Sequence, residues 1–338
     1  MTFSIVIPSY NGSAFIDQAL RSALDQTRRP DEIVLSDDNS NDRTLEIAER
    51  YADKVRIVRN PNGPSGFVNG WNHAIDQASS DFVVLLHQDD LLYPTFLEEA
   101  EAVLKKYPEV KHLFAACDYI DETGNILQKP DYCNGETVLY DWTAYVKAYQ
   151  QIGHPHIHRC PGVVTHRDIL QRCRYNPEAG HIADDDFFFR VGRFTPVAGI
   201  LKPLAAYRHH VGSETGHLTN TQLESRLARD YLFQLRQWTT TDRLPKEPFV
   251  YEYLRREAQK HVFREVIQCR AFATAKTDRD TAQAHRKEFS DYCRFTLRQR
   301  FLLGLSLVVG RRGTRLLIDS KHRWNRRKTK KTVQGVTA

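Results

Sequence analysis

Short apolar runs alternate with longer amphipathic segments over the first 120 residues of the chain. Each apolar run is long enough for one buried strand, and between the runs apolar side chains recur every three or four residues, as in a helix. This alternation indicates an α/β fold with a mostly parallel, Rossmann-like sheet that helices cover on both faces. The predicted strands are residues 4–8, 32–35, 55–58 and 82–86, and the predicted helices are residues 15–24, 45–51 and 66–78.

A different pattern begins near residue 220. Leu223, Leu227, Tyr231 and Leu235 recur at helical spacing, and later segments repeat this pattern among many Arg and Glu residues. We therefore expect two parts: an α/β domain over residues 1–220 and a helical C-terminal region over residues 221–338.

Composition narrows the class of protein. The chain has 338 residues, of which 41% are hydrophobic and 27% charged, so it buries a sizeable core. Its longest apolar run, residues 301–309, is far shorter than the roughly twenty residues that span a membrane. No secretory signal opens the sequence, and the six cysteines are scattered without a C-x-x-C pair, which favours a reducing compartment. We expect a cytoplasmic protein.

Charge is divided unevenly along the chain. Residues 292–338 contain 13 Lys or Arg and one acid, whereas residues 1–291 contain 35 basic and 41 acidic residues. The apolar run at 301–309 and the basic run at 323–331 together are typical of a segment that lies in a membrane interface among anionic head groups. We expect peripheral attachment at the inner face of the cell membrane. Nucleic-acid binding is disfavoured because no groove-reading motif is present, and a solvated helix with a frayed tail is the alternative.

Adjacent carboxylates stand at two of the predicted strand ends. In an open sheet, ligands bind beyond the carboxyl ends of the strands, which here are residues 8–12, 36–40 and 87–90. Asp89 and Asp90 directly follow a strand, where two acids repel each other unless a cation lies between them. Mg²⁺ and Mn²⁺ prefer oxygen ligands and are commonly held by carboxylates together with substrate phosphates. The pair thus predicts a metal–diphosphate site; the alternative is that Asp90 caps a helix and Asp89 is merely solvated.

The acids at the end of the second strand have a plainer interpretation. Ser40 or Asn41 is expected to cap the helix that follows, just as Ser13 is expected to cap the preceding helix. Acids near such a helix start are favoured by the helix dipole. Capping does not account for Asp38, whose place at the strand end lets it accept hydrogen bonds from a base or a ribose.

Three consecutive acids, Asp184, Asp185 and Asp186, precede three phenylalanines at residues 187–189. At helical spacing the aromatic rings would anchor the helix and leave the acids facing the ligand. A carboxylate near apolar rings and other acids has a raised pKa, which suits it to take a proton from an alcohol. The alternative is that one of the acids caps the helix.

Three ordered segments together carry a recognisable pattern: residues 4–11 read SIVIPSYN, residues 31–42 read DEIVLSDDNSND, and residues 88–90 read QDD. This set resembles glycosyltransferase family 2, with its GT-A fold, over roughly the first 210 residues. The resemblance implies that Asp38 reads the nucleotide base, with Pro8 and Ser9 lining the same pocket.

The resemblance assigns further roles. Asp89 and Asp90 match the family's D-x-D-type motif, with Asp90 as the direct metal ligand, while His87 stands where the family usually has another acid. Asp184 falls at the position of the catalytic base, although Ala183 replaces the usual Glu before it, so Asp185 and Asp186 remain alternatives. His210, within residues 207–213 (YRHHVGS), lies where a loop closes over the diphosphate and is a candidate contact to metal or phosphate.

The implied reaction is an inverting transfer of a sugar from a nucleotide diphosphate, of UDP or dTDP type, to a hydroxyl acceptor. The cofactor would be Mn²⁺ or Mg²⁺, and the acceptor a saccharide or lipid-linked saccharide in the synthesis of cell-surface polysaccharide or glycolipid. A metal-dependent sugar nucleotidyltransferase is one alternative, but it would carry a Gly-rich basic loop where residues 8–12 read PSYNG. A non-catalytic carbohydrate-binding protein is another. The histidine-rich segment 154–158 indicates acceptor contacts or structure, because no second cluster completes a zinc site.

Overall fold

The computed structural model describes residues 1–151, 160–213, 218, 220–240, 248–272, 276–292, 294–309 and 314. The chain divides near residue 216 into two compact units, which we call the α/β unit and the helical unit. The histidine-rich segment at 154–158 and the basic run at 323–331 lie outside the described residues.

A ten-stranded sheet forms the centre of the α/β unit, in the order β3-β2-β1-β4-β9-β6-β10-β5, with β7 beside β6 and β8 beside β10. The four predicted strands are β1 to β4, and they run parallel to one another. The strands are β1 (Phe3–Ser9), β2 (Glu32–Asp37), β3 (Arg56–Arg59), β4 (Phe82–Leu85), β5 (Leu91–Leu92), β6 (His112–Ile120), β7 (Ile126–Gln128), β8 (Thr137–Tyr140), β9 (Val163–His166) and β10 (Val197–Arg208).

The second half of the sheet is mixed. β9 is antiparallel to both of its neighbours, β4 and β6, whereas β6 and β10 run parallel. Short antiparallel strands pair with the long ones: β7 with β6, and β5 and β8 with β10. The predicted GT-A architecture is therefore present, with a parallel N-terminal half and an antiparallel strand inserted beside it.

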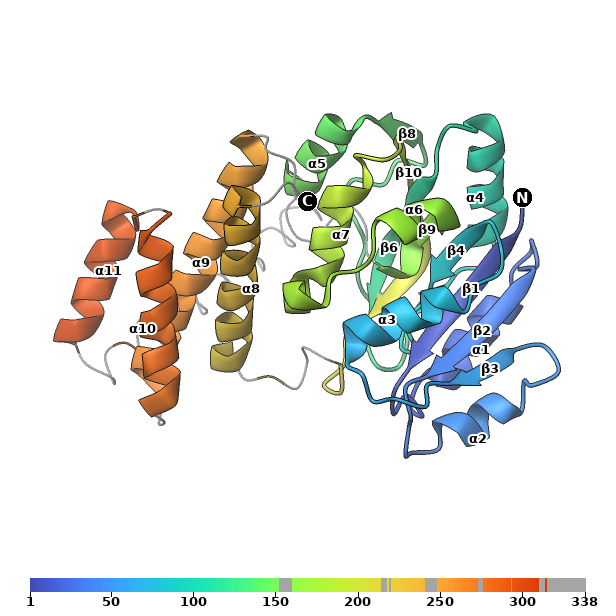
Figure 1. Ribbon diagram of the computed structural model, residues 1–338, viewed down its shortest axis with the longest axis horizontal. Coiled ribbons are helices and arrows are strands. Elements are labelled where there is room, and N and C mark those ends of the chain that lie inside the picture. The colour runs from blue at the N-terminus through green and yellow to red at the C-terminus, as the bar shows by residue number, and fades with distance from the viewer. Residues whose placement is uncertain are drawn as a thin grey trace, which may run out of the picture. The chain divides into compact units, whose positions relative to one another are not determined.

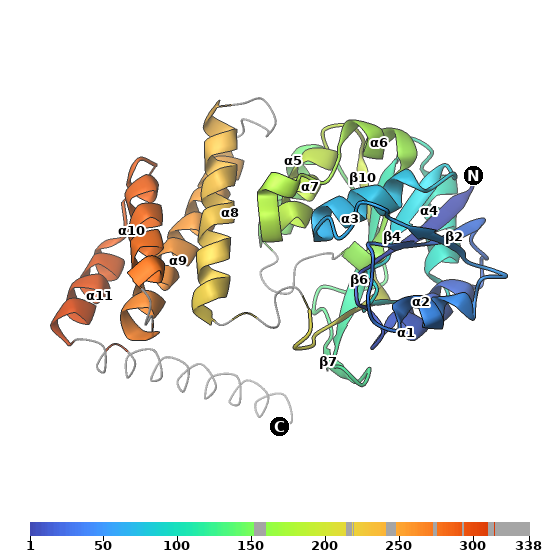
Figure 2. The same ribbon diagram turned by 60° about the horizontal axis from the view of Figure 1, so that its bottom comes forward.

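Helices cover both faces of the sheet, with α1, α2 and α4 on one face and α3 and α6 on the other (Figures 1 and 2). Alternate residues of the parallel strands, such as Ile5, Ile7 and Leu35, pack with α1, α2 and α4 into one apolar core. The helices of this unit are α1 (Ile16–Leu24), α2 (Thr44–Glu49), α3 (Phe67–Asp76), α4 (Phe96–Lys106), α5 (Trp142–Gln151), α6 (Arg167–Arg172) and α7 (Ala183–Val191).

The predicted helix caps are wrong. α1 has Phe15 at its N-cap position without a side-chain cap, and the Ser13 backbone N–H instead donates to Asp42 Oδ2 at 3.0 Å. α2 has Arg43 at its N-cap, so neither Ser40 nor Asn41 caps it. Ser40 Oγ accepts a hydrogen bond from the Asn11 backbone N–H at 2.9 Å, joining the loops that follow β1 and β2. Ser40 thus joins the two loops through its side chain and Ser13 joins them through its backbone N–H, and neither starts a helix.

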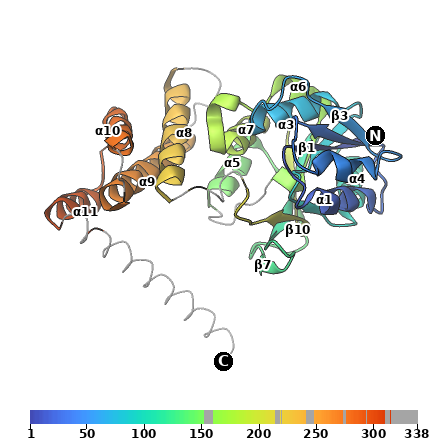
Figure 3. The ribbon, with the colours of Figure 1, turned by 90° about the horizontal axis from the view of Figure 1, so that it is seen from below.

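The helical unit contains four described helices, α8 (Asn220–Thr240), α9 (Pro248–Phe272), α10 (Lys276–Ser290) and α11 (Leu297–Val308). α8 packs on α9, α10 packs on both, and α11 packs on α9 (Figure 3). Val266, Cys269, Ala282 and Leu303 form a small core among α9, α10 and α11. Among the described residues, no helix is both long enough and apolar enough to cross a membrane.

Candidate active site

The carboxyl ends of β1 and β2 lie side by side. Ser9 is in register with Asp37, and the Asp38 backbone N–H donates to the Ser9 carbonyl at 2.7 Å, so Asp38 follows directly from this pairing. Pro8 and Ser9 are both buried at the same edge. The sheet register therefore brings together the three residues predicted to line a nucleotide pocket.

Asp38 is held by the segment that leads into α3. Its Oδ1 accepts from Asn60 Nδ2 at 2.7 Å, and its Oδ2 accepts from the Ser65 backbone N–H at 2.7 Å. Gly63 lies so close that an added Cβ would meet Asp38 Oδ1 at 2.6 Å. The carboxylate is thus buried and oriented by donors on two sides, and Gly63 leaves room for it.

Gln88 fastens the acidic segment to the end of β1. Its Oε1 accepts from Ser9 Oγ at 2.7 Å and from the Tyr10 backbone N–H at 3.0 Å, while its Nε2 donates to the Tyr10 carbonyl at 3.2 Å. The Gln88 side chain therefore keeps residues 87–90 beside the predicted nucleotide pocket.

His87, Asp89 and Asp90 form a group of metal-ligand type. Each offers one ligand atom, and these atoms all lie within 4.8 Å of one another. His87 Nδ1 is 3.6 Å from Asp90 Oδ2, and His87 Nε2 is a buried atom without a hydrogen-bond partner among the described residues. One imidazole and two carboxylates suit a divalent cation, so the donor set fits the predicted metal.

The protonation states in this group also suit a cation. Burial lowers the pKa of His87 by more than the charges of Asp89 and Asp184 raise it. The ring is therefore neutral and able to bind metal. Burial alone would raise the pKa of Asp89, but the hydrogen bond with His210 opposes burial, and the pKa of Asp89 is lowered overall. The group thus combines a neutral imidazole with an ionised carboxylate.

Arg208, at the end of β10, anchors the loop that carries these ligands, and sequence reasoning gave it no role. It is 1% exposed, and its Nε donates to the Asp89 carbonyl at 2.8 Å. Its Nη1 donates to the carbonyls of Asp121 and Glu122, each at 3.1 Å, and its Nη2 donates to Gln18 Oε1 at 2.8 Å. No spacing in the sequence indicates this role, because the bonds go to carbonyls far away along the chain.

His210 contacts Asp89 rather than joining the group of three. Its Nε2 lies 2.8 Å from Asp89 Oδ2, and its ring packs edge-on against Phe15 with centroids 4.6 Å apart. The loop predicted to close over a diphosphate is therefore attached to one of the acids of the predicted D-x-D-type motif.

The three acids of α7 have different surroundings. Asp184 is partly exposed, and its Oδ1 accepts from the Asp185 backbone N–H at 2.9 Å. Asp185 is 5% and Asp186 4% exposed, and Asp186 Oδ2 accepts from Arg190 Nε at 2.9 Å. Asp186 therefore forms an ion pair with Arg190. Arg190 is itself held in place, because its Nη2 also donates to the Arg174 carbonyl at 2.7 Å. The N-cap of α7 is Ile182, and none of the three acids caps the helix.

Aromatic rings connect α7 with the His87 group. The His87 ring stacks on Trp71 with centroids 4.8 Å apart, Trp71 contacts Tyr175 edge-on at 5.4 Å, and Tyr175 stacks on Phe187 at 4.3 Å. The carboxylate of Asp184 is close enough to His87 for its charge to raise the pKa of that ring. The structure therefore brings Asp184 to the same edge as Asp89 and Asp90, although about a hundred residues separate them in sequence.

The alternative for Asp90, a helix cap, does not hold. The residues after it form β5 rather than a helix, and Asp90 is 1% exposed. Its Oδ1 accepts from the Arg208 backbone N–H at 2.9 Å, which leaves Oδ2 directed toward His87. The carboxylate therefore joins two strands and contributes to the group of potential ligands.

Comparison with known proteins relates the segment that carries most of this arrangement to a known family. Residues 4–169 match the family described as Glycosyl transferase family 2. This segment belongs to glycosyl transferase family 2. The match covers β1 to β9 and the His87 group, and it confirms the family that the sequence motifs predicted.

Curated relatives of this family 2 domain match only part of the chain. An uncharacterized glycosyltransferase of Rickettsia typhi is 36% identical over 132 residues, 38% of this chain and 41% of that protein. GalNAc(5)-diNAcBac-PP-undecaprenol beta-1,3-glucosyltransferase of Campylobacter jejuni is 31% identical over 127 residues, 36% of this chain and 40% of that protein. The chain thus spans less than half the length of these relatives.

Solved structures resemble the chain over most of its length. Staphylococcus aureus TarS 1–349 in complex with UDP-GlcNAc has a TM-score of 0.66 at 16% identity, over 96% of this chain and 92% of that one. Mannosyltransferase PcManGT from Pyrobaculum calidifontis, in complex with GDP-Man and Mn²⁺, has a TM-score of 0.53 at 18% identity, over 91% of this chain and 79% of that one. At these identities the likeness establishes the shared GT-A fold alone.

Proposed function

We propose that the chain is a metal-dependent, inverting glycosyltransferase that moves a sugar from a nucleoside diphosphate to a hydroxyl group of a saccharide or lipid-linked saccharide. The observation that carries this proposal is the meeting of Asp38, the His87–Asp89–Asp90 group and Asp184 at one edge of the sheet. Each offers a different function: an acceptor for a base or ribose, a cation site, and a partly exposed carboxylate.

The nucleotide would lie across the ends of β1 and β2. Asp38 is fixed by Asn60 and Ser65, so a remaining lone pair accepts a hydrogen bond from the base or ribose without reorganisation. Pro8 and Ser9 would line the same pocket, and Asp89 would lie beside the phosphates. A UDP or dTDP donor is consistent with this arrangement, and the UDP-GlcNAc complex of TarS supports a UDP sugar.

His87, Asp89 and Asp90 would hold the cation, with Asp90 as a direct ligand. When bound, Mn²⁺ or Mg²⁺ neutralises the charge that develops on the leaving diphosphate. An imidazole nitrogen among the donors favours Mn²⁺, because Mg²⁺ binds almost solely through oxygen. The Mn²⁺ complex of PcManGT supports the same choice. His210 would orient Asp89 and keep it ionised, with a contact to phosphate as its second role.

Asp184 would act as the catalytic base. Among the three acids of α7 it is the partly exposed one, whereas Asp186 is committed to Arg190. It would accept the acceptor hydroxyl proton as that oxygen forms a bond to the anomeric carbon. The bond from the anomeric carbon to the diphosphate oxygen breaks on the opposite face, and its electron pair leaves with the nucleoside diphosphate. One displacement inverts the configuration at that carbon.

The family 2 relative from Campylobacter jejuni, named for an undecaprenol-linked acceptor, supports a lipid-linked saccharide as the acceptor class. Such an acceptor would explain a basic C-terminal region that attaches the enzyme to the inner face of the cell membrane. In this proposal the α/β unit performs the transfer and the helical unit places it at the membrane surface, where polysaccharide or glycolipid is assembled.

A screen of nucleotide sugars tests the proposal. Purified protein is incubated with each donor and Mn²⁺, Mg²⁺ or EDTA, and release of nucleoside diphosphate is measured for the parent, Asp90→Ala and Asp184→Asn. We expect release from one donor class, its loss in EDTA, and its loss in both variants. Undiminished release in EDTA would remove the metal from the proposal, and undiminished release by Asp184→Asn would remove the base.

A further inference from the structure

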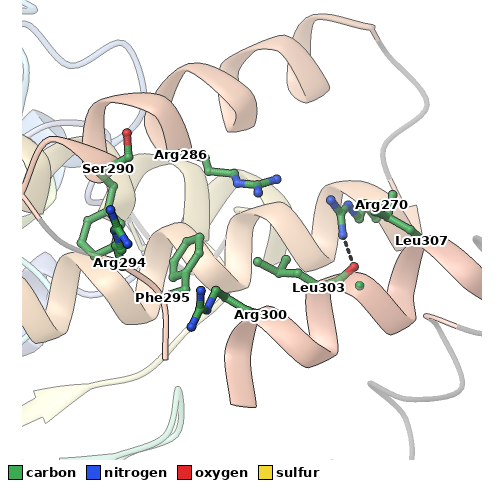
Figure 4. Close-up of a pocket in the computed structure, with 10 residues that line it drawn as sticks. Arg270, Arg286, Ser290, Arg294, Phe295, Arg300, Leu303 and Leu307 are labelled. Carbon is green, nitrogen blue, oxygen red and sulfur yellow. Dashed lines mark hydrogen bonds between the residues drawn. The ribbon is translucent and has the colours of Figure 1, made fainter. Parts of the chain in front are cut away.

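One cavity of the helical unit is lined by arginines from three helices and a joining segment (Figure 4). It has a volume of about 390 Å³ and lies among α9, α10, α11 and the residues that join α10 to α11. No carboxylate is among its lining residues. The arginines are Arg270 of α9, Arg286 of α10, Arg294 of the joining segment and Arg300 of α11.

Three of these cations, Arg270, Arg286 and Arg300, have no acidic partner in the part of the chain that the structure describes. Arg270 Nη1 donates to the Leu303 carbonyl at 2.6 Å and to Ser306 Oγ at 2.5 Å, which fixes its guanidinium at the wall of the cavity. Arg286 extends from α10 toward Arg270, and burial together with the charge of Arg286 lowers the pKa of Arg270. An anion entering here gains from several cations at once.

The floor of the cavity is apolar. Phe289 and Leu303 are 1% and 4% exposed, and Phe295 and Leu307 line the same space. Guanidinium groups match the oxygens of a phosphate in bidentate fashion, whereas rings and leucines favour hydrocarbon. A phosphate attached to an apolar body therefore fits the lining better than an inorganic ion does.

α11 also carries exposed apolar side chains, one of which, Leu307, lines the cavity itself. Leu297, Phe301 and Leu307 are 77%, 68% and 69% exposed. On the helix, Arg300, Leu303 and Leu307 share one face at spacings of three and four residues, and Leu297 and Phe301 lie on the adjoining face. Large side chains exposed together next to cations are typical of a helix that lies in a membrane interface.

We propose that this cavity binds the phosphate of an anionic phospholipid head group, while Leu297, Phe301 and Leu307 enter the acyl region of the same bilayer. The inference rests on the membrane attachment in the proposed function and deepens it, because it assigns the attachment to a built site on folded helices. Contacts of the basic tail with the membrane are then additional and unspecific.

Vesicle binding by the full-length protein tests the inference. Co-sedimentation is measured with vesicles of phosphatidylcholine alone and with vesicles that also contain phosphatidylglycerol. Arg286→Gln and Arg300→Gln are each expected to weaken binding to the anionic vesicles by about fivefold, and the double variant by about twenty-fivefold. The double variant Arg172→Gln/Arg256→Gln removes the same charge from exposed sites outside the cavity and is expected to bind as the parent does. Phe301→Ser is expected to weaken binding to anionic vesicles without changing net charge.

Three results would overturn the inference. Equal losses of vesicle binding in Arg286→Gln/Arg300→Gln and in Arg172→Gln/Arg256→Gln would mean that only the net charge of the protein attracts it to the vesicles. If calorimetry detected binding of inorganic diphosphate to the parent, and Arg286→Gln/Arg300→Gln abolished that binding but left vesicle binding intact, the cavity would be assigned to a soluble phosphate. Retention of random duplex DNA that depends on Arg286 and Arg300 would assign it to nucleic acid. Binding of nucleoside diphosphate with Mn²⁺ is measured in the same variants and is expected to be unchanged, so a failure of the donor site is distinguished from a failure of this one.

Discussion

The Arg208 backbone N–H donates a hydrogen bond to Asp90 Oδ1 over 2.9 Å, joining residues that lie 118 positions apart. The same arginine holds the Asp89 carbonyl through its Nε. Arg208, at the end of β10, thus orients two consecutive acids: its backbone N–H holds Asp90, and its side chain holds Asp89. The positions of Asp89 and Asp90 in the cation group are therefore held by a long-range contact.

Arg208→Met is the first test of that relationship. The substitution keeps the backbone N–H and the aliphatic volume but removes the donors to the carbonyls of Asp89, Asp121 and Glu122. Three partly buried carbonyls left without these donors are expected to lower the free energy of unfolding by about 3 kcal/mol. Urea unfolding at neutral pH measures this loss, and Mn²⁺ affinity should fall in the same variant. Stability equal to that of the parent would mean that the anchoring is dispensable.

Asp184 and Asp186 form a matched pair of acids on one helix with opposite expected behaviour. Asp184→Asn is expected to reduce the transfer rate by about 10²- to 10⁴-fold and to leave the melting temperature unchanged, because a partly exposed base is lost. Asp186→Asn breaks the buried pair with Arg190 and is expected to cost about 3 kcal/mol of stability. Transfer assays and thermal unfolding of both variants provide the readout. The reverse result would assign the base to Asp186.

His87 gives a prediction about metal binding that needs no substrate. His87→Ala removes one ligand atom from the group of three and is expected to weaken Mn²⁺ binding by at least about tenfold, because loss of an outer-shell partner alone costs that much. The electron paramagnetic resonance signal of free Mn²⁺ reports the bound fraction directly. His209→Ala, in the exposed neighbouring loop, is the control. Equal Mn²⁺ affinity in the parent and His87→Ala would exclude the imidazole as a ligand.

His112 predicts a pH dependence of stability. Burial lowers its pKa to about 3 from the ordinary 6.5, so the unfolded chain binds a proton between these values that the folded chain does not. Its contribution to the free energy of unfolding is therefore present above pH 6.5 and is lost progressively as the pH falls below that value, by about 2 kcal/mol at pH 5.

Urea unfolding at pH 7 and pH 5 measures this slope. His112→Gln is expected to flatten it, because glutamine keeps a polar group near Thr165, whose Oγ1 lies 2.8 Å from His112 Nδ1, without a titrating ring. An unchanged slope in the variant would show that other groups cause the acid sensitivity.

The parallel half of the sheet was predictable because its signals are local. β1 to β4 are short apolar runs, and in α1 to α3 apolar residues recur every three or four positions. Each of these elements is therefore specified by its own residues. Strand β9 was not predictable in the same way. Its antiparallel position between β4 and β6 depends on pairing with segments far away in the sequence, which no local pattern reports.

The candidate site was predictable to a similar degree. Asp38, Asp89 and Asp90 follow strands, so the rule for strand ends located them without a structure. The roles of Gln88 and Arg208 were not visible, because hydrogen bonds to distant backbone groups leave no spacing in the sequence. The caps at Ser13 and Ser40 were wrong for a related reason: both residues serve a contact between two loops, Ser40 through its side chain and Ser13 through its backbone N–H.

Calorimetric titration with UDP and dTDP, each with and without Mn²⁺, is the most direct test of the claim that these distant segments form one nucleotide and metal site. The parent is expected to bind one nucleotide more tightly when Mn²⁺ is present. Asp38→Asn should weaken that binding in both conditions, whereas Asp90→Asn should weaken it only when Mn²⁺ is present. Affinities and Mn²⁺ enhancement that are the same in the parent and both variants would contradict the account.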